Sequence, residues 1–312
     1  MGVPFFSAAA VRATVPYDVA YAAVREAFIA HARGEWTMQP KLYVTNYPAG
    51  DFRAMPALGG GHALLKWVTS FPGNPALGLP TVSGLVVLSD AETGMVEAVL
   101  EAGAVTALRT GAAAVLAAET LRPGFRVAAV IGAGVNGRAV IEQLGSRYDV
   151  RVFDRDRNRA ESAVEELGGS GWVAPSIEVA LACEVVVTVT PGQEIVLAEG
   201  SLTPGQHVSL MGADGPGKAE IAVAELARAR VFCDDWVQAS HGGELAAAVA
   251  ADVIARSDVT ELGAVLTGEA RGRRSEDEIT IFDSTGLAIQ DLAIAVAAHR
   301  RAGELELPQL DL

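Results

Sequence analysis

The sequence lacks the features that would mark several protein classes. Only two of its 312 residues are cysteines, Cys183 and Cys233, and neither belongs to a CxxC or Cys/His pattern. A disulfide-stapled scaffold and a structural zinc site are therefore disfavoured. The five histidines show no metal-ligand or catalytic-triad spacing, and no GxSxG segment is present. We predict no bound metal and no serine nucleophile.

Positive charge is also scarce. Lys plus Arg number 24 against 38 Asp plus Glu, which gives a formal net charge of −14 at pH 7. Repulsion from phosphate groups argues against non-specific nucleic-acid binding and against an anionic membrane surface. No run of about 18 uncharged apolar residues exists, and the N-terminus lacks the basic segment of a signal peptide. We therefore expect a cytoplasmic protein that binds neither nucleic acid nor membrane.

Half of the residues are hydrophobic, which is enough for one large domain or two ordinary ones. Residues 17–33 carry apolar side chains at helical spacing and predict a helix. Residues 40–100 alternate short apolar runs with turns such as DAETG, and predict a mostly antiparallel sheet with hairpins. Residues 105–121 are rich in alanine and predict a helix with Thr106 near its N-cap.

From residue 125 the pattern alternates between strands and helices, which implies parallel strands joined by helical crossovers. The segment EITIFD (278–283) predicts a last strand, and residues 284–302 predict a last helix. We predict an α/β protein with two domains. A doubly wound, Rossmann-type domain covers 119–282, and an α+β domain covers 1–118, joined by the C-terminal segment 283–312.

A GxGxxG segment follows the first strand of the alternating region, and Asp154 ends the next strand 22 residues after Gly132 (154 − 132). Glycines let the backbone approach a pyrophosphate, and the following helix offers free N–H groups. A carboxylate at Asp154 suits ribose hydroxyls and favours NAD(H), although Arg155 leaves NADP(H) open. The alternative is a Rossmann-like domain that binds no cofactor. We predict these cofactor-binding residues: Gly132, Gly134, Val135, Asn136, Gly137, Asp154, Arg155 and Thr110.

Lys66 lies in the apolar stretch LLKWV and, in a strand, shares a face with Leu64 and Val68. A buried lysine is costly unless it pairs with an anion or loses its proton. The equally plain alternative is an edge-strand lysine whose ammonium reaches solvent.

Three more cations, Lys41, Arg53 and Arg109, fall in the same part of the chain. Together with Lys66 they would suit a small carboxylate, since arginine binds carboxylates through two parallel hydrogen bonds. Taken alone, Arg109 better suits an exposed position on a helix. Asp214 follows the strand HVSLM, at the edge where doubly wound folds bind ligands, although it also suits a simple turn.

Several stretches occur in the order typical of one family: KW at 66–67, LRTGAAAVLAAETL, IGAGVNG, GADGPGKAE and IFDSTGLAIQDLA. On these stretches the chain resembles the ornithine cyclodeaminase/mu-crystallin family, nearly from end to end. The resemblance implies a homodimer, with the N-terminal domain used for substrate binding and dimerisation. It implies catalytic roles for Asp214 and Lys66, and carboxylate binding by Lys41, Arg53 and Arg109.

The resemblance also points to one departure. Ornithine cyclodeaminases carry a Glu immediately before a Met-Pro pair, near the ornithine side chain, and the corresponding residue is Ala54. A distal ammonium would lack its partner there. We therefore expect an NAD(H)-dependent dehydrogenase or imine reductase that acts on a small amino, imino or oxo acid. Two alternatives remain: an ornithine cyclodeaminase-type lyase with catalytic NAD, and a mu-crystallin-like binding protein without catalysis.

Overall fold

The computed structural model describes residues 2–168, 171–215 and 217–312, and the chain divides into two compact units. The first unit holds residues 1–109 and 287–312, and the second holds residues 110–286. The first division falls inside helix α3 (Ala102–Leu121), whereas the sequence placed it after residue 118. A continuous helix carries no turn signal that would mark a division within it.

The first unit is built on a mainly antiparallel sheet in the order β16-β1-β7-β6-β5-β4-β2, with β3 paired to β4. Strands β4 and β5 are joined by Gly60 and Gly61, whose positive φ angles of 60° and 83° suit a tight two-residue hairpin. The strands of this unit are β1 (Val3–Phe6), β2 (Thr37–Met38), β3 (Leu42–Asn46), β4 (Gly50–Gly59), β5 (His62–Ser70), β6 (Val82–Asp90), β7 (Val96–Glu101) and β16 (Gln309–Leu310).

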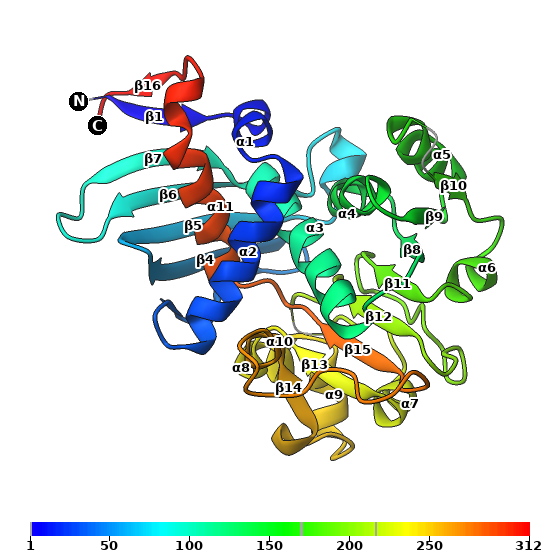
Figure 1. The fold of residues 1–312 in the computed structure, drawn as a ribbon. Coiled ribbons are helices and arrows are strands. Elements are labelled where there is room, and N and C mark those ends of the chain that lie inside the picture. The colour runs from blue at the N-terminus through cyan, green and yellow to red at the C-terminus, as the bar shows by residue number, and fades with distance from the viewer. Residues whose placement is uncertain (1, 169–170, 216) are drawn as a thin grey trace. The chain divides into compact units, whose positions relative to one another are not determined.

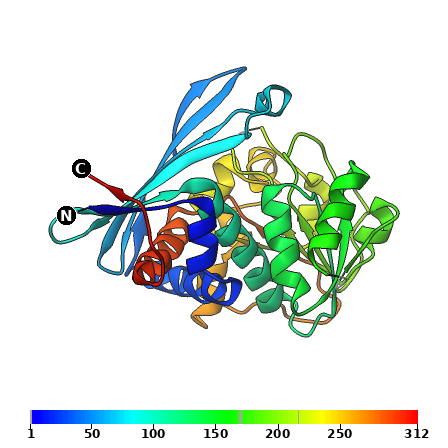
Figure 2. The same ribbon diagram turned by 90° about the horizontal axis from the view of Figure 1, so that it is seen from above.

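One face of this sheet forms a core with helices. Along β5, Leu64, Lys66 and Val68 are buried, while Leu65 and Trp67 between them are exposed. Helices α2 and α11 pack together on the buried face, as both views show (Figures 1 and 2). The antiparallel sheet and the helix over 17–33 are confirmed. The helices of this unit are α1 (Ala8–Thr14), α2 (Tyr17–Ala32), the start of α3, and α11 (Ala288–Arg300).

Two local predictions in this unit had different outcomes. The DAETG turn is confirmed, because the Asp90 carboxylate accepts hydrogen bonds from the backbone N–H and the hydroxyl of Thr93. The N-cap at Thr106 is wrong, since the helix begins at Ala102. The Glu101 carboxylate accepts the N–H groups of Gly103 and Ala104 at 2.7 Å each, so the first turn forms earlier in the chain.

The second unit contains a fully parallel sheet in the order β10-β9-β8-β11-β12-β15-β13-β14, which confirms the doubly wound fold class. Its strands are β8 (Val127–Ile131), β9 (Asp149–Phe153), β10 (Gly171–Val173), β11 (Val185–Thr188), β12 (His207–Leu210), β13 (Arg230–Cys233), β14 (Val259–Glu261) and β15 (Thr280–Asp283). Its helices, after the end of α3, are α4 (Val135–Gly145), α5 (Arg157–Glu166), α6 (Ile177–Leu181), α7 (Val223–Arg228), α8 (Trp236–Gly242), α9 (Leu245–Ala250) and α10 (Leu262–Leu266).

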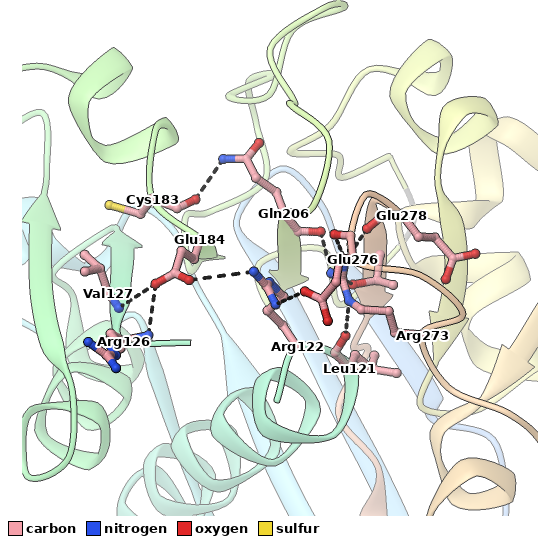
Figure 3. A network of polar contacts seen from close by, with 11 residues as sticks. Leu121, Arg122, Arg126, Val127, Cys183, Glu184, Gln206, Arg273, Glu276 and Glu278 are labelled. Atoms are coloured by element: carbon pink, nitrogen blue, oxygen red, sulfur yellow. Dashed lines mark hydrogen bonds and ion pairs between the residues drawn. The ribbon is translucent and has the colours of Figure 1, made fainter. Parts of the chain in front are cut away.

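Four strands of this sheet are linked near their amino ends by a polar network (Figure 3). The Glu184 carboxylate accepts the N–H groups of Arg126 and Val127 and pairs with Arg122 at 3.7 Å. Arg273 donates to the carbonyls of Leu121, at 2.7 Å, and Gln206, at 2.9 Å. These arginine and carboxylate side chains bind backbone groups of other residues in the same unit. They therefore stabilise this edge of the sheet.

Helix α3 is long and apolar enough to cross a membrane by length and composition. However, 83% of the relevant 18-residue window is buried inside the fold. It is therefore a core helix of the structure.

Candidate active site

The GxGxxG turn joins β8 to α4 and has no room for side chains at two of its glycines. Gly132 has a φ of 105°, and a Cβ there would lie 2.6 Å from the carbonyl oxygen of Val189. A Cβ on Gly137 would overlap the carbonyl of Gly132. Space remains open around Gly134, which precedes the first turn of α4, and no side chain caps that turn. The free N–H groups at this end suit the pyrophosphate of a dinucleotide.

Asp154 follows β9 and rests against the same turn. One of its carboxylate oxygens accepts the N–H of Ala133 at 2.7 Å, and the other accepts the N–H of Asp156 at 2.9 Å. The structure thus brings the predicted acid to the glycine turn. Val135 and Asn136 form the start of α4, and Val135 is well exposed.

The two remaining predicted cofactor residues have other surroundings. Arg155 is exposed, and its guanidinium pairs with Glu194 at 2.7 Å. Thr110 is buried in α3, and its hydroxyl has no hydrogen-bond partner within the described part of the chain. The next residue, Gly111, packs on α4, where a Cβ would lie 2.8 Å from the carbonyl oxygen of Ala139.

Lys66 is the centre of a buried polar cluster in the first unit. It lies on β5, an interior strand between β4 and β6, so the edge-strand alternative is wrong. Its ammonium donates to the hydroxyl of Thr106 at 2.6 Å and to the Asp291 carboxylate at 2.9 Å. Burial lowers the pKa of Lys66 to about 8, against the opposing effect of Asp291.

Two predicted arginines lie around this lysine. Arg53 on β4 is buried, and its guanidinium donates to both oxygens of the Asp51 carboxylate, at 2.6 and 3.3 Å. Only 12% of the Arg109 side chain is exposed, and its Nε lies 3.5 Å from Asp291 Oδ1, so the exposed-helix alternative for Arg109 is wrong. Both arginines contribute to lowering the pKa of Lys66, after the larger effects of burial and Asp291. Lys41 is partly buried between β2 and β3.

The structure changes the argument made from Ala54. This residue is paired with Trp67 in the register of β4 and β5, whereas Met55 is paired with Lys66. Ala54 and Trp67 belong to the face opposite Arg53 and Lys66, because successive side chains on a strand alternate between faces. A glutamate at position 54 would face away from the cation cluster. On the cluster side of β4 the chain carries Arg53, and a positive charge there disfavours a distal ammonium.

Asp214 lies beyond the end of β12, which stops at Leu210. Its carboxylate pairs with Lys218 at 2.6 Å, and 36% of its side chain is exposed. An ion pair thus joins Asp214 to Lys218 beyond the carboxyl edge of the sheet, where such folds bind ligands.

Glu220 is a buried acid at this edge of the sheet. Its buried carboxylate accepts hydrogen bonds from both hydroxyls of Thr188 and Thr190, at 2.7 and 2.6 Å, and from the N–H groups of Thr190 and Gly212, at 2.8 Å each. Burial raises the pKa of Glu220, while these donors lower it. The carboxylate of Glu244 in turn accepts the N–H of Glu220 at 2.8 Å.

A further acid organises the segment after β15. Asp234 accepts the N–H of Gly286 at 2.8 Å and the hydroxyls of Ser284 and Thr285 at 3.3 and 3.2 Å. This pairing keeps Ser284–Gly286 out of the last helix, which begins at Ala288 instead of residue 284. No group of three or more His, Cys, Asp or Glu residues suited to a metal occurs in the described ranges.

Known proteins resemble the chain along nearly its whole length. The profile of the ornithine cyclodeaminase/mu-crystallin family matches residues 4–305. The chain is 44% identical to an alanine dehydrogenase of Archaeoglobus fulgidus over 94% of this chain and 92% of that protein. A solved archaeal alanine dehydrogenase dimer with bound NAD matches with a TM-score of 0.94 and 40% identity, covering 100% of both chains. The iminosuccinate reductase of Paracoccus denitrificans in complex with NAD+ matches at 0.90 and 27%, again covering 100% of both.

Proposed function

Because the chain belongs to the ornithine cyclodeaminase/mu-crystallin family, we propose that it is an NAD(H)-dependent oxidoreductase. Its substrate is a small L-amino acid or the corresponding imino acid, and the reaction takes place at the α-carbon. The observation that carries this proposal is the cluster of Lys66, Arg53 and Arg109, which is largely buried. Such cations form charge-assisted hydrogen bonds with a carboxylate.

The cations of the cluster favour one substrate class. Lys66, Arg53 and Arg109 lie beside two resident carboxylates, Asp51 and Asp291. Lysine and arginine side chains bind a substrate carboxylate. A second ammonium on the substrate would lie close to these cations, and a buried charge without an opposite charge is costly.

The second unit fits the cofactor. The turn at Gly132 and Gly137 leaves no room for a Cβ, and Gly134 opens the N-terminus of α4 to a pyrophosphate. Asp154, which accepts the N–H of Ala133 at this turn, would accept the ribose hydroxyls, which favours NAD(H) over NADP(H). The bound cofactor would supply a hydride acceptor for the substrate α-carbon as NAD+, and a hydride donor in the reverse direction as NADH.

Substrate binding, proton transfer and water orientation would fall to side chains of this protein. Arg53, Arg109 and Lys41 would bind the substrate carboxylate. In the oxidative direction Asp214 would take a proton from the α-amine as the hydride leaves, so that the C–N bond becomes an imine. Lys66 would orient the water that adds to this imine, and release of ammonia then leaves a 2-oxo acid. In the reductive direction the same groups serve an imine reductase.

The proposal includes a homodimer formed by the exposed face of the first unit's sheet. Apolar side chains on this face include Leu42, Trp67 and Leu85, which are 59%, 43% and 46% exposed and lie in one cross-strand row. A contiguous apolar surface of this kind marks an interface. Light scattering should give twice the 32.3 kDa of one chain, and Trp67→Glu should shift the population toward monomer. A monomeric wild type contradicts this part of the proposal.

The decisive experiment is an absorbance assay at the reduced-nicotinamide band. Purified protein is given NAD+ with a panel of L-amino acids, or NADH with 2-oxo acids plus ammonia or methylamine. We expect a stoichiometric nicotinamide change with a small monocarboxylate. The proposal includes a cytoplasmic location, which suits the two free cysteines. Ammonia and a cyclic imino acid without net NADH would instead identify a cyclodeaminase.

Asp214→Ala should lower turnover about 100-fold to 10,000-fold and leave NAD binding intact, because a general base is removed from the reaction and not from the cofactor turn. Asp277→Ala, which removes an exposed acid of the same unit, is the matched control. Turnover within tenfold of wild type would contradict the role of Asp214. A protein that binds NAD yet turns over nothing on the panel would favour a binding function.

A further inference from the structure

Asp291 is a buried acid far from Lys66 in the chain, and the sequence motifs assign it no role. It lies in the first turn of α11, fully buried, 225 residues from the lysine it contacts. Its Oδ1 accepts a hydrogen bond from Lys66 and lies 3.5 Å from Arg109 Nε. The other oxygen, Oδ2, is buried and has no hydrogen-bond partner among the described residues. Among the described residues, the contacts of this carboxylate are therefore with the cations Lys66 and Arg109.

Thr106 completes the surroundings of the lysine. Its hydroxyl proton is committed to the carbonyl oxygen of Ala102, at 2.7 Å, so toward Lys66 the hydroxyl can act only as an acceptor. The Lys66 nitrogen therefore has two fixed acceptors, one on α3 and one on α11. Both hydrogen bonds persist whether the nitrogen is an ammonium or a neutral amine, because a neutral amine still carries two N–H groups.

This geometry fixes the direction of the third substituent of the nitrogen. In the ammonium that substituent is an N–H, and in the neutral amine it is the lone pair. No third partner for it occurs within the described ranges. A lysine held at two points can thus release a proton and take one up along a single direction without rotating its side chain.

We propose that Asp291 and Thr106 are positioning residues that clamp the Lys66 nitrogen at two points and direct its third site toward the substrate. The direction toward substrate rests on the proposed function, whereas the clamp rests only on the contacts. The charged groups that surround Lys66 from the packed elements are Arg53 with Asp51 on β4, Arg109 on α3, and Asp291 on α11.

The two clamp residues have separable effects. Asp291 is the negative charge closest to Lys66, so its removal leaves a buried ammonium beside two guanidinium groups and favours the neutral amine. Thr106 carries no charge, and its removal mainly frees the amine to rotate. Asp291→Asn should therefore change protonation, and Thr106→Val should change orientation.

Protonation can be measured directly because the chain has only three lysines, Lys41, Lys66 and Lys218. With 13C,15N-labelled lysine, three side-chain signals titrate, and Lys66→Met assigns the relevant one. Wild-type Lys66 should titrate at a pKa of about 8. Asp291→Asn should lower this pKa by about one unit or more. Asp18→Asn, which removes an exposed charge from the same unit, should not move it, and Lys218 serves as an internal reference.

Kinetics then test positioning. In Asp291→Asn the pH profile of kcat/KM should move by the same amount as the NMR titration, with KM for NADH unchanged. Thr106→Val should lower kcat about tenfold with a smaller pKa displacement, and Thr106→Ser, which keeps the hydroxyl, should restore it. An unmoved Lys66 titration in Asp291→Asn, or equal kcat in Thr106→Val and wild type, overturns the clamp.

The two proposals can fail separately. If the wild type shows no oxidoreductase activity but Asp291→Asn moves the Lys66 titration, the proposed function is wrong and the clamp on the lysine stands. If the wild type is active and neither variant changes titration or kcat, the clamp is wrong and the function stands. Should Asp291→Asn not fold, the Thr106→Val and Thr106→Ser pair still decides the question, since valine matches threonine in shape.

Discussion

Each unit of the molecule buries a cluster of ionisable groups, and the two clusters differ in kind and in partners. In the first unit the cluster pairs cations, Lys66 and Arg53 above all, with carboxylates. In the second unit the buried groups are acids, chiefly Glu220, Glu244 and Asp283, and their partners are backbone N–H groups and hydroxyls.

The different partners indicate two roles for buried ionisable groups, which are ligand binding and the fixing of loops. The first cluster holds lysine and arginine groups, which bind carboxylates, so it suits an added anion. The acids of the second unit accept hydrogen bonds from neutral donors, which fix the backbone segments that carry them. Burial raises the pKa of Glu244 to about 9 and that of Asp283 well above its usual range. The first cluster is therefore suited to binding, and the second to holding loops.

The largest effect should follow from removing the centre of the acid cluster. Glu220→Ala leaves the partly buried N–H groups of Thr190 and Gly212 without this acceptor, and a donor left unsatisfied costs about 1–3 kcal/mol. We expect the free energy of unfolding to fall by about 3–5 kcal/mol in chemical denaturation. Activity should fall as well, because the loop of Asp214 loses its support.

Glu220→Gln sharpens this test, since its amide keeps the shape and one acceptor oxygen and should recover part of both losses. Glu269→Ala, an exposed acid of the same unit, is the control and should change stability by less than about 0.5 kcal/mol. An equally stable Glu220→Ala protein would show that these hydrogen bonds do not hold the loops.

The cation cluster of the first unit can be tested by removing one arginine. Arg109→Ala should raise KM for the carboxylate substrate about 100-fold, or about 2.7 kcal/mol, with KM for NADH unchanged, because a charge-assisted contact to the carboxylate is lost. Arg109→Lys keeps the charge without the two-point geometry and should fall between. Arg12→Ala, exposed in the same unit, is the control. An unchanged substrate KM would remove Arg109 from the binding site.

The acid cluster also predicts a pH dependence of stability. The folded-state pKa of Glu244 is raised from 4.5 to about 9, chiefly by burial and by Asp283 and Glu220. Between these values the folded protein holds a proton that the unfolded chain has released. Stability therefore falls as pH rises, by up to about 1.4 kcal/mol per unit from this group.

Glu244→Gln resembles the protonated acid and should flatten that slope above pH 4.5, measured by denaturant unfolding at a series of pH values. The exposed Glu199→Gln should leave the slope unchanged. Identical slopes in wild type and Glu244→Gln would mean that Glu244 is ionised in the folded protein.

Periodicity in the sequence predicts most of the fold. The alternation of strands and helices after residue 125 predicts the parallel sheet, since parallel strands need long crossover connections, which are usually helices. The burial of Lys66 also follows locally, because Leu64 and Val68 set the face of its strand. The short helices α8 and α9 carry too few residues for a periodic signal.

The partners of the charged residues are harder to predict. Asp291 contacts Lys66 across 225 residues, and Glu220 contacts Thr188 across 32. An acid within the apolar run LAIQDLAIAV is the single local sign that Asp291 is buried and paired. Which cation it meets depends on how α11 packs on β5, and no pattern in either segment encodes that packing.

The smallest expected effect concerns an acid that is held by N–H groups but partly open to solvent. Asp154 accepts the N–H of Ala133 at the glycine turn and is free of the deep burial that marks Glu244. Asp154→Ser should weaken ribose binding and remove repulsion of a 2′-phosphate, with Arg155 nearby to attract it. The preference for NADH over NADPH, measured as a ratio of kcat/KM, should drop about tenfold. Asp149→Ser, at the amino end of the same strand, should leave the ratio unchanged, and an unaltered ratio in Asp154→Ser would place cofactor selection elsewhere.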